Sequence, residues 1–340
     1  MRKRLLHRLQ PLLLLISLAL VALLLHSQWT ELQAHPWRLH GGWLVVSAAA
    51  LLAAWLIEVN LWQRLLAGVG GQLPFWPAWR IWFLTALVRY IPGNIWQPLS
   101  MTLYCQQWGV RPEATLMSMV FYQAITLLAV APIAALYLLL NQQTGVWTGL
   151  LAGATPWLIG VGLAPLLVFL SRPAWLVALV NWALRRIGRP ALETTLSTGR
   201  LLLFLSLGVL SWLLWGASFA ALTFGLLVYT NDEILRLAPY LVAVFSVGYA
   251  IGFLSLITPS GFGVREGAYY LLLTPLLDGG AVTVAALAMR IWIVLGEVMM
   301  AGLSAIGLRS PEAQTSSQPS SVYAPTPVSP YVAPHEPRTE

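Results

Sequence analysis

The sequence is poor in the residues that build catalytic and metal sites in soluble proteins. Only 9% of its 340 residues are charged, whereas soluble globular proteins carry about 25%. The single cysteine, Cys105, excludes an intrachain disulfide and argues against a zinc or iron–sulfur site. The five histidines lie near the two ends of the chain, without a paired metal-binding spacing. We therefore expect no metal and no other cofactor.

Motifs of nucleotide-driven and metal-dependent enzymes are also missing. The chain has no G-x-x-x-x-G-K-[ST] phosphate loop, and no DxD or DDxxD cluster that would hold a metal-bound donor. Lysine occurs once, at Lys3, so the net charge of +7 comes almost entirely from arginine. These arginines lie between apolar runs. We therefore interpret them as topology signals and contacts to anionic lipid headgroups, not as a nucleic-acid site.

Long apolar runs dominate what is present. The chain is 58% hydrophobic, with a mean hydropathy of +0.74, and several runs approach the ~20 residues that cross a bilayer. The sequence predicts an all-α, polytopic membrane helix bundle of about 7–8 full spans. The predicted spans cover residues 11–25, 43–62, 114–140, 147–170, 201–229, 240–257 and 281–308.

Two regions do not fit a simple span. Residues 81–100 carry an apolar run that is too short, followed by Pro92-Gly93-Asn94, and residues 258–277 begin with TPSGFGVREG. Gly and Pro break helices, and a broken backbone at membrane depth must be buried in protein or line a watery cavity. We predict discontinuous or re-entrant helices in both regions. A loop at the membrane surface, with Arg265 and Glu266 as an interfacial pair, is the alternative for the second.

The arginines predict the domain organisation and the topology. A basic linker between residues 172 and 200 separates two halves, about 1–171 and 200–309, of one transmembrane domain. The similar breaks in the two halves suggest a structural repeat. The positive-inside rule places this linker and the N-terminus in the cytoplasm, for a multi-pass protein of the cell membrane. Residues 175–184 are expected to form an amphipathic surface helix, and the Pro- and Ser-rich residues 310–340 a disordered tail.

The last predicted span holds two ionisable residues. Arg290 and Glu297 are seven positions apart, which places them on one helical face. Charged residues inside a membrane protein generally face the bundle interior. We expect a buried pair that links this helix to a functional site or that serves packing alone.

The stretch TPSGFGVREG resembles the signature of the lysylphosphatidylglycerol synthase/flippase transmembrane family, which reads close to P-G-G-L-G-V-R-E-G. Ser260 and Phe262 depart from it. The matching positions are Pro259, Gly261, Gly263, Val264, Arg265, Glu266 and Gly267. RYIPGNIW, with the downstream Gly109, is similar to the first-half motif of the family, and the resemblance covers about residues 10–308.

The resemblance implies a membrane bundle with re-entrant elements that moves a phospholipid or lipid-linked headgroup between leaflets. Bifunctional members carry a soluble aminoacyl-transfer domain after the membrane part. Because only the predicted tail follows here, the synthase activity is not implied. The first hypothesis is thus a flippase-like translocator whose partners are membrane lipids.

In this hypothesis, Arg265 contacts a lipid phosphate, and backbone N–H groups near Gly261 and Gly263 add partial positive charge. Glu266 pairs with a basic headgroup or holds Arg265 in place. Arg89 and Asn94 play the matching role in the first half.

Two further hypotheses remain open. One is an intramembrane transferase that uses a polyprenyl-phosphate or phospholipid donor, although the membrane regions offer few carboxylates for it. The other is a non-catalytic membrane subunit that presents lipid to a separate transferase in glycoconjugate synthesis. The lipid, the direction of movement and the oligomeric state do not follow from the sequence, although the Gly248–Gly252 spacing suits helix packing within or between chains.

Overall fold

The computed structural model describes residues 39–90, 96–144, 150–186, 188, 191, 194–254 and 263–306. Within these ranges the chain is helical and has no strand. The predicted first span, the predicted tail and the candidate site residues Asn94 and Gly261 lie outside the described residues.

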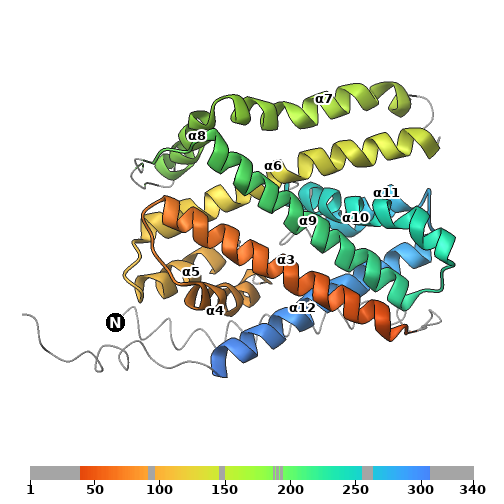
Figure 1. Ribbon diagram of the computed structural model, residues 1–340, viewed down its shortest axis with the longest axis horizontal. Coiled ribbons are helices and arrows are strands. Elements are labelled where there is room, and N and C mark those ends of the chain that lie inside the picture. Colours follow the sequence, from red (N-terminus) through yellow and green to blue (C-terminus); the bar gives the residue numbers. More distant parts are fainter. Residues whose placement is uncertain are drawn as a thin grey trace, which may run out of the picture. The chain divides into compact units, whose positions relative to one another are not determined.

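In the described part of the chain, six helices are long and apolar enough to cross a membrane (Figure 1). Each has at least 22 residues, so at about 1.5 Å per residue it reaches the ~30 Å of a bilayer core. The predicted polytopic all-α fold is confirmed. The six are α3 (Gly41–Gly68), α6 (Pro112–Thr144), α7 (Leu150–Ser171), α9 (Thr198–Leu226), α10 (Asn231–Leu254) and α12 (Gly279–Ile306).

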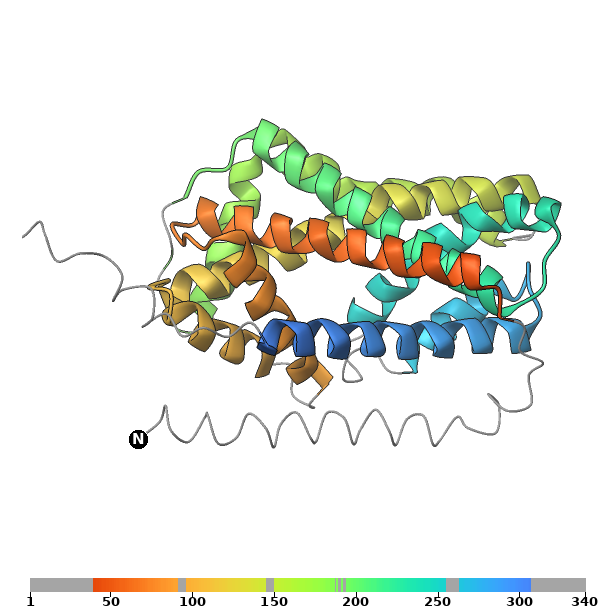
Figure 2. The same cartoon turned by 60° about the horizontal axis from the view of Figure 1, so that its bottom comes forward.

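Small residues bring the central helices together. Helices α3 and α9 run side by side, and the Ser47 hydroxyl in α3 donates to the Ser218 carbonyl of α9 at 2.8 Å (Figures 1 and 2). In α9, a Cβ added at Gly216 would lie 2.2 Å from the Val242 carbonyl oxygen of α10. Such close backbone approach is how membrane helices associate in the absence of a strong hydrophobic driving force.

Two helical hairpins each contain a helix that is too short to span a bilayer. The first consists of α4 (Phe75–Ala86), the 3₁₀ turn η1 (Leu87–Tyr90) and α5 (Trp96–Gln106). The second consists of α10 and α11 (Val264–Leu273). Helices α5 and α11 have 11 and 10 residues, so each extends only about 15 Å, half of a bilayer core. The predicted discontinuous helices are therefore confirmed in both regions.

The hairpins enter from opposite ends of the bundle (Figure 2). Gly71, just after α3, is close to Val110, just after α5. At the other end, His40 donates its N–H to the Gly225 carbonyl of α9, and Gly279 at the start of α12 adjoins Tyr270 of α11. Two hairpins that enter from opposite sides are the arrangement of inverted repeats in transporters.

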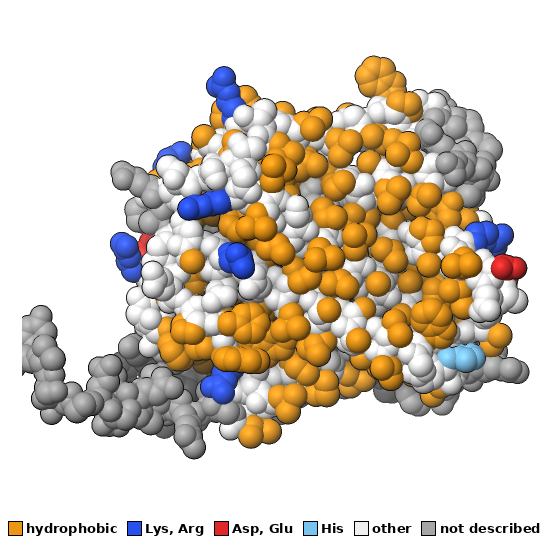
Figure 3. Space-filling view, viewed as in Figure 1, with side chains coloured by type: hydrophobic (Ala, Val, Ile, Leu, Met, Phe, Trp, Pro, Cys, Tyr) orange, Lys and Arg blue, Asp and Glu red, His pale blue; other side chains and the backbone are white. Residues whose placement is uncertain are grey.

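The charged residues mark the two ends. We call the end where α3 finishes and α9 begins the basic end, because it holds Arg64, Arg80, Arg111, Arg172, Arg185, Arg186 and Arg200. Asp232, Glu233 and Asp278 lie at the opposite end. Between the two ends, the face drawn in Figure 3 is mostly hydrophobic.

A short amphipathic helix, α8 (Pro173–Arg186), lies at the basic end, where the sequence predicts a surface helix. Leu176 and Leu184 are buried, whereas Trp182 is exposed and Arg186 stacks over its ring at 5.2 Å. This alternation fits a helix that lies at a membrane interface.

Candidate functional site: charged residues at two helix breaks

Helix α12 binds the first hairpin through an ion pair. Glu297 of α12 has 0% of its side chain exposed and pairs with Arg89 of η1. A carboxylate buried at this depth needs a charged partner, because moving it alone from water costs several kcal/mol. The pair fixes the inner end of η1, next to the break, against α12.

The same helix binds the second hairpin through an ion pair in which α12 supplies the arginine and the hairpin supplies the glutamate. Arg290 of α12 pairs with Glu266 of α11. The other carboxylate oxygen of Glu266 accepts the N–H of Gly263 at 2.8 Å, which caps the start of α11. Gly263 has a φ of +79°, a conformation that only glycine adopts without strain.

Arg290 and Glu297, which the sequence predicts as a buried pair, each have a partner on a hairpin. Seven residues of helix separate the two backbones by about 10 Å along the axis. The shared face was predicted correctly, but each residue pairs with a different hairpin.

Arg265 is held by aromatic rings. Its guanidinium carbon lies 4.7 Å from the ring centre of Phe245, 5.3 Å from Tyr249 and 5.5 Å from Tyr269. Its Nε donates to the Tyr269 hydroxyl at 2.6 Å. Glu266, which was expected to pair with a basic headgroup or to hold Arg265 in place, pairs with Arg290 and caps α11. In the described part of the chain, no carboxylate forms an ion pair with Arg265.

A glycine makes room for this cage. A Cβ added at Gly248 of α10 would lie 2.2 Å from Cε1 of Tyr269. The Tyr269 ring also stacks against Phe219 at 5.5 Å, and its hydroxyl donates to the Phe245 carbonyl at 3.3 Å. Gly248 thus serves packing within the chain, which is one of the two roles expected for it.

Glu58 is a site residue that the sequence analysis did not select. Its side chain is 8% exposed and accepts hydrogen bonds from Trp215 Nε1 at 2.8 Å and Ser211 Oγ at 3.4 Å. The span was predicted to end at residue 62, which put Glu58 near the membrane surface. Because α3 continues to Gly68, Glu58 lies about 15 Å inside it. A single acidic residue within a long apolar run was the available signal.

An aromatic contact connects Glu58 to the Arg265 cage. Trp215, which donates to Glu58, stacks on Phe245 with ring centres 5.6 Å apart and an interplanar angle of 6°. Phe245 in turn lies under Arg265. Arg89 and the Tyr122 hydroxyl are further polar neighbours of Glu58.

Together these residues form an intramembrane charge cluster, which consists of Glu58, Arg89, Arg265, Glu266, Arg290 and Glu297. Its formal charge is balanced, with an equal number of arginines and glutamates. Two arginine–glutamate pairs account for four members. Arg265 and Glu58 are the remaining two, and neither forms an ion pair within the described residues. Such an arrangement can bind an anionic group at Arg265 without breaking an existing pair.

Comparisons with known proteins agree with this architecture. The family model described as "Lysylphosphatidylglycerol synthase TM region" matches residues 12–297, a range that includes both hairpins and the whole cluster. No curated protein and no solved structure matches the chain. Because the model covers most of the chain, this protein belongs to the lysylphosphatidylglycerol synthase transmembrane-region family.

Proposed function

We propose that the protein is a lipid translocator that moves a phospholipid or a lipid-linked headgroup between leaflets. The family match and the six apolar helices establish an integral membrane protein with a lipid-related function. The observation that supports translocation is Arg265. It is a half-buried cation beside a helix break, held by aromatic rings and lacking a carboxylate partner in the described residues.

Arg265 offers the chemistry that a lipid phosphate needs. Its Nε is used by Tyr269, which leaves the two terminal nitrogens for a bidentate bond to phosphate oxygens. Arg265 also lies in the first turn of α11, where the helix dipole favours an anion. The contributions expected from Gly261 and Asn94 remain predictions, because both lie outside the described residues.

The other two arginines receive a different role in this proposal. Arg89 and Arg290 already neutralise glutamates, so a phosphate would have to displace a carboxylate to reach them. We therefore assign the phosphate to Arg265 and assign the two ion pairs to holding the hairpins against α12. The headgroup would cross beside the hairpins, where polar groups replace water.

The test is leaflet exchange of a headgroup-labelled phospholipid in vesicles that contain the purified protein, scored by bleaching of the outer-leaflet label. We expect Arg265→Ala to abolish exchange. Arg265→Lys should restore only part of it, because lysine keeps the charge but loses the planar fork. The matched control is Arg236→Ala, which removes an exposed arginine of α10.

Exchange that is unchanged in correctly folded Arg265→Ala would reject the proposal. Absence of exchange in the wild-type protein, with lipid modified only when a co-purifying transferase is added, would instead support the subunit hypothesis. Formation of a modified lipid by the protein alone would support the intramembrane transferase.

We propose that the protein lies in the cell membrane. Following the positive-inside rule, its basic end and its N-terminus face the cytoplasm. Single cysteines at Arg185 and at Asp232, in a Cys105→Ser background, test this. A membrane-impermeant maleimide added to intact cells should label the cysteine at 232 and not the one at 185. The reverse pattern would invert the orientation.

A further inference from the structure

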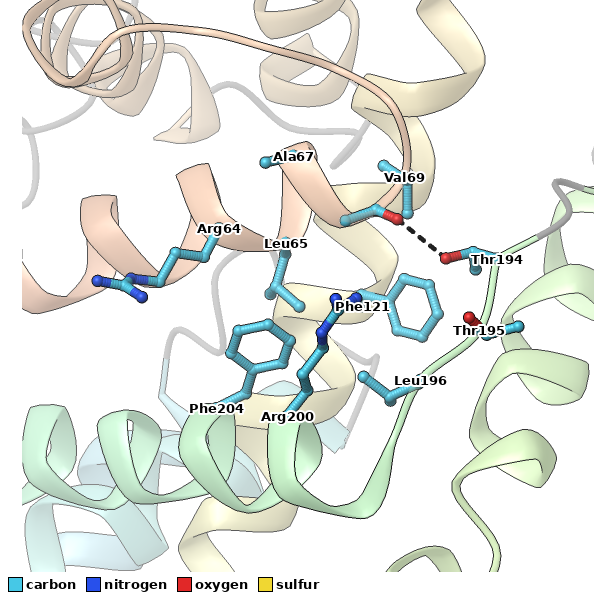
Figure 4. A pocket seen from close by; sticks show the side chains of 11 residues that line it. Arg64, Leu65, Ala67, Val69, Phe121, Thr194, Thr195, Leu196, Arg200 and Phe204 are labelled. Carbon is cyan, nitrogen blue, oxygen red and sulfur yellow. Dashed lines mark hydrogen bonds between the residues drawn. The ribbon is translucent and has the colours of Figure 1, made fainter.

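The basic end contains a pocket that is separate from the charge cluster. It has a volume of about 290 Å³ and lies between the end of α3, the start of α9 and the first third of α6 (Figure 4). Its wall contains the buried side chains of Leu65, Phe121 and Phe204. Its polar lining consists of Arg64, Thr194, Thr195 and Arg200. The pocket is therefore apolar in its depth and cationic at its rim.

Arg200 is the cation best placed to serve this pocket. Figure 4 shows its side chain pointing from α9 toward Phe121 and the end of α3. Arg64 turns along α3, where its Nε donates to Asn60 Oδ1 at 2.7 Å. Among the described residues, no aspartate or glutamate lines the pocket, and neither arginine forms an ion pair there.

Two oxygen atoms near the rim, which would repel an anion, already accept hydrogen bonds within the protein. The Thr194 hydroxyl donates to the terminal Gly68 carbonyl of α3 at 2.9 Å. Ser197 caps α9 by accepting the N–H of Arg200 at 3.3 Å. The start of α9, with the positive end of its dipole, therefore adjoins the same rim. The Thr195 hydroxyl remains as a donor on the pocket wall.

We propose that this pocket binds a phosphate group at Arg200, and that an apolar segment attached to the phosphate packs on Phe121 and Phe204. A phospholipid at the interface has this chemistry, because its phosphodiester is anionic and its glycerol and acyl part is apolar. A soluble phosphate shares the first feature and lacks the second. The inference does not depend on translocation, since it concerns a second site at the basic end, away from the charge cluster.

The experiment uses the purified full-length protein and has two arms. In the first, native mass spectrometry counts phosphatidylglycerol that remains bound after detergent exchange. In the second, titration calorimetry measures binding of inorganic phosphate and of glycerol 3-phosphate. The variants are Arg200→Gln and Thr195→Val. Arg185→Gln is the matched control, because it removes the same charge from an exposed position of α8 outside the pocket.

We expect Arg200→Gln to weaken phosphatidylglycerol binding about tenfold, the typical loss of one charge-assisted contact. Thr195→Val, which keeps the shape, should have a smaller effect, and Arg185→Gln none. Phosphatidylglycerol binding that depends on Arg200 identifies a lipid site. Binding of the soluble phosphates alone, with the same dependence, identifies a soluble ligand for the same phosphate chemistry.

Equal binding by wild-type and Arg200→Gln protein in both arms would overturn the proposal, as would an equal loss in Arg185→Gln. Thermal unfolding of each variant shows that it is folded. Arg265→Ala separates this site from the translocation proposal, because the part of phosphatidylglycerol binding that depends on Arg200 should persist in this variant while leaflet exchange is lost.

Discussion

Glu297 of α12 pairs with Arg89 of η1 across the interior of the bundle, between residues 208 positions apart in sequence. This pair ties the first hairpin, which enters from the basic end, to the last span. The Arg290–Glu266 pair does the same for the hairpin from the opposite end. A single helix thus holds both broken segments, which restricts how far either can move alone.

The Arg89–Glu297 pair should show strong coupling in a double-mutant cycle. Arg89→Met removes the arginine that neutralises the fully buried Glu297 carboxylate, and we expect a loss of about 3–5 kcal/mol in the free energy of unfolding. Arg89→Met combined with Glu297→Leu should recover most of this loss, because no charge is then stranded. Reversible unfolding in mixed micelles measures the free energy of unfolding of the wild-type protein and of each variant. Additive losses in the double variant would show that the pair is not coupled.

Glu266 should separate two roles by graded substitution. Its carboxylate pairs with Arg290 and accepts the Gly263 N–H. Glu266→Gln keeps an acceptor for the cap but removes the ion pair, whereas Glu266→Ala removes both. We expect unfolding free energy to fall in the order wild type, Gln, Ala, with the second step about 1 kcal/mol, the usual contribution of a cap.

The same Glu266 series has a functional readout. Leaflet exchange should survive in part in Glu266→Gln, because Arg265 is held by rings and not by Glu266. As for stability, equal free energies of unfolding of Glu266→Gln and Glu266→Ala would contradict the capping role of Glu266, because the hydrogen bond from Gly263 would then contribute nothing.

Gly248→Ala should displace the Arg265 cage. The added methyl group would lie 2.2 Å from the Tyr269 ring, so the ring must move and Arg265 loses its hydrogen bond. We expect exchange to fall nearly as far as in Arg265→Ala, with a folded protein. Gly267→Ala is the matched control, because nothing lies within 4 Å of its added methyl group and alanine favours the helix by up to about 1 kcal/mol. Equal activity of the two variants would contradict this role of Gly248.

Glu58 should tolerate an amide better than an apolar residue. Glu58→Gln keeps an oxygen acceptor for Trp215 Nε1, whereas Glu58→Leu leaves this buried donor unsatisfied. An unsatisfied buried group costs about 1–3 kcal/mol, so Glu58→Leu should be the less stable variant by that amount. The free energy of unfolding of the two variants, compared in the same mixed micelles, measures the difference. The opposite order of stability would mean that the Trp215 contact is unimportant.

Much of the architecture was accessible from the sequence. Apolar runs long enough for a bilayer predicted the spans now seen as α3, α6, α7, α9, α10 and α12. Pro and Gly in a region of few charges predicted both breaks, because backbone preference is a local property. Helix ends were less accurate: α3 continues to Gly68, six residues beyond its predicted end.

The partners of the charged residues depended on the tertiary structure. Hydropathy and helical periodicity identified Arg89, Arg265, Arg290 and Glu297 as costly in a membrane, and placed two of them on one face. These two sequence patterns carry no information on which residues far away in sequence approach that face. The two hairpins determine it, by bringing Arg89 and Glu266 to α12 and by surrounding Arg265 with rings from α10 and α11. Local sequence sets where a helix breaks, whereas long-range packing sets which charge meets which.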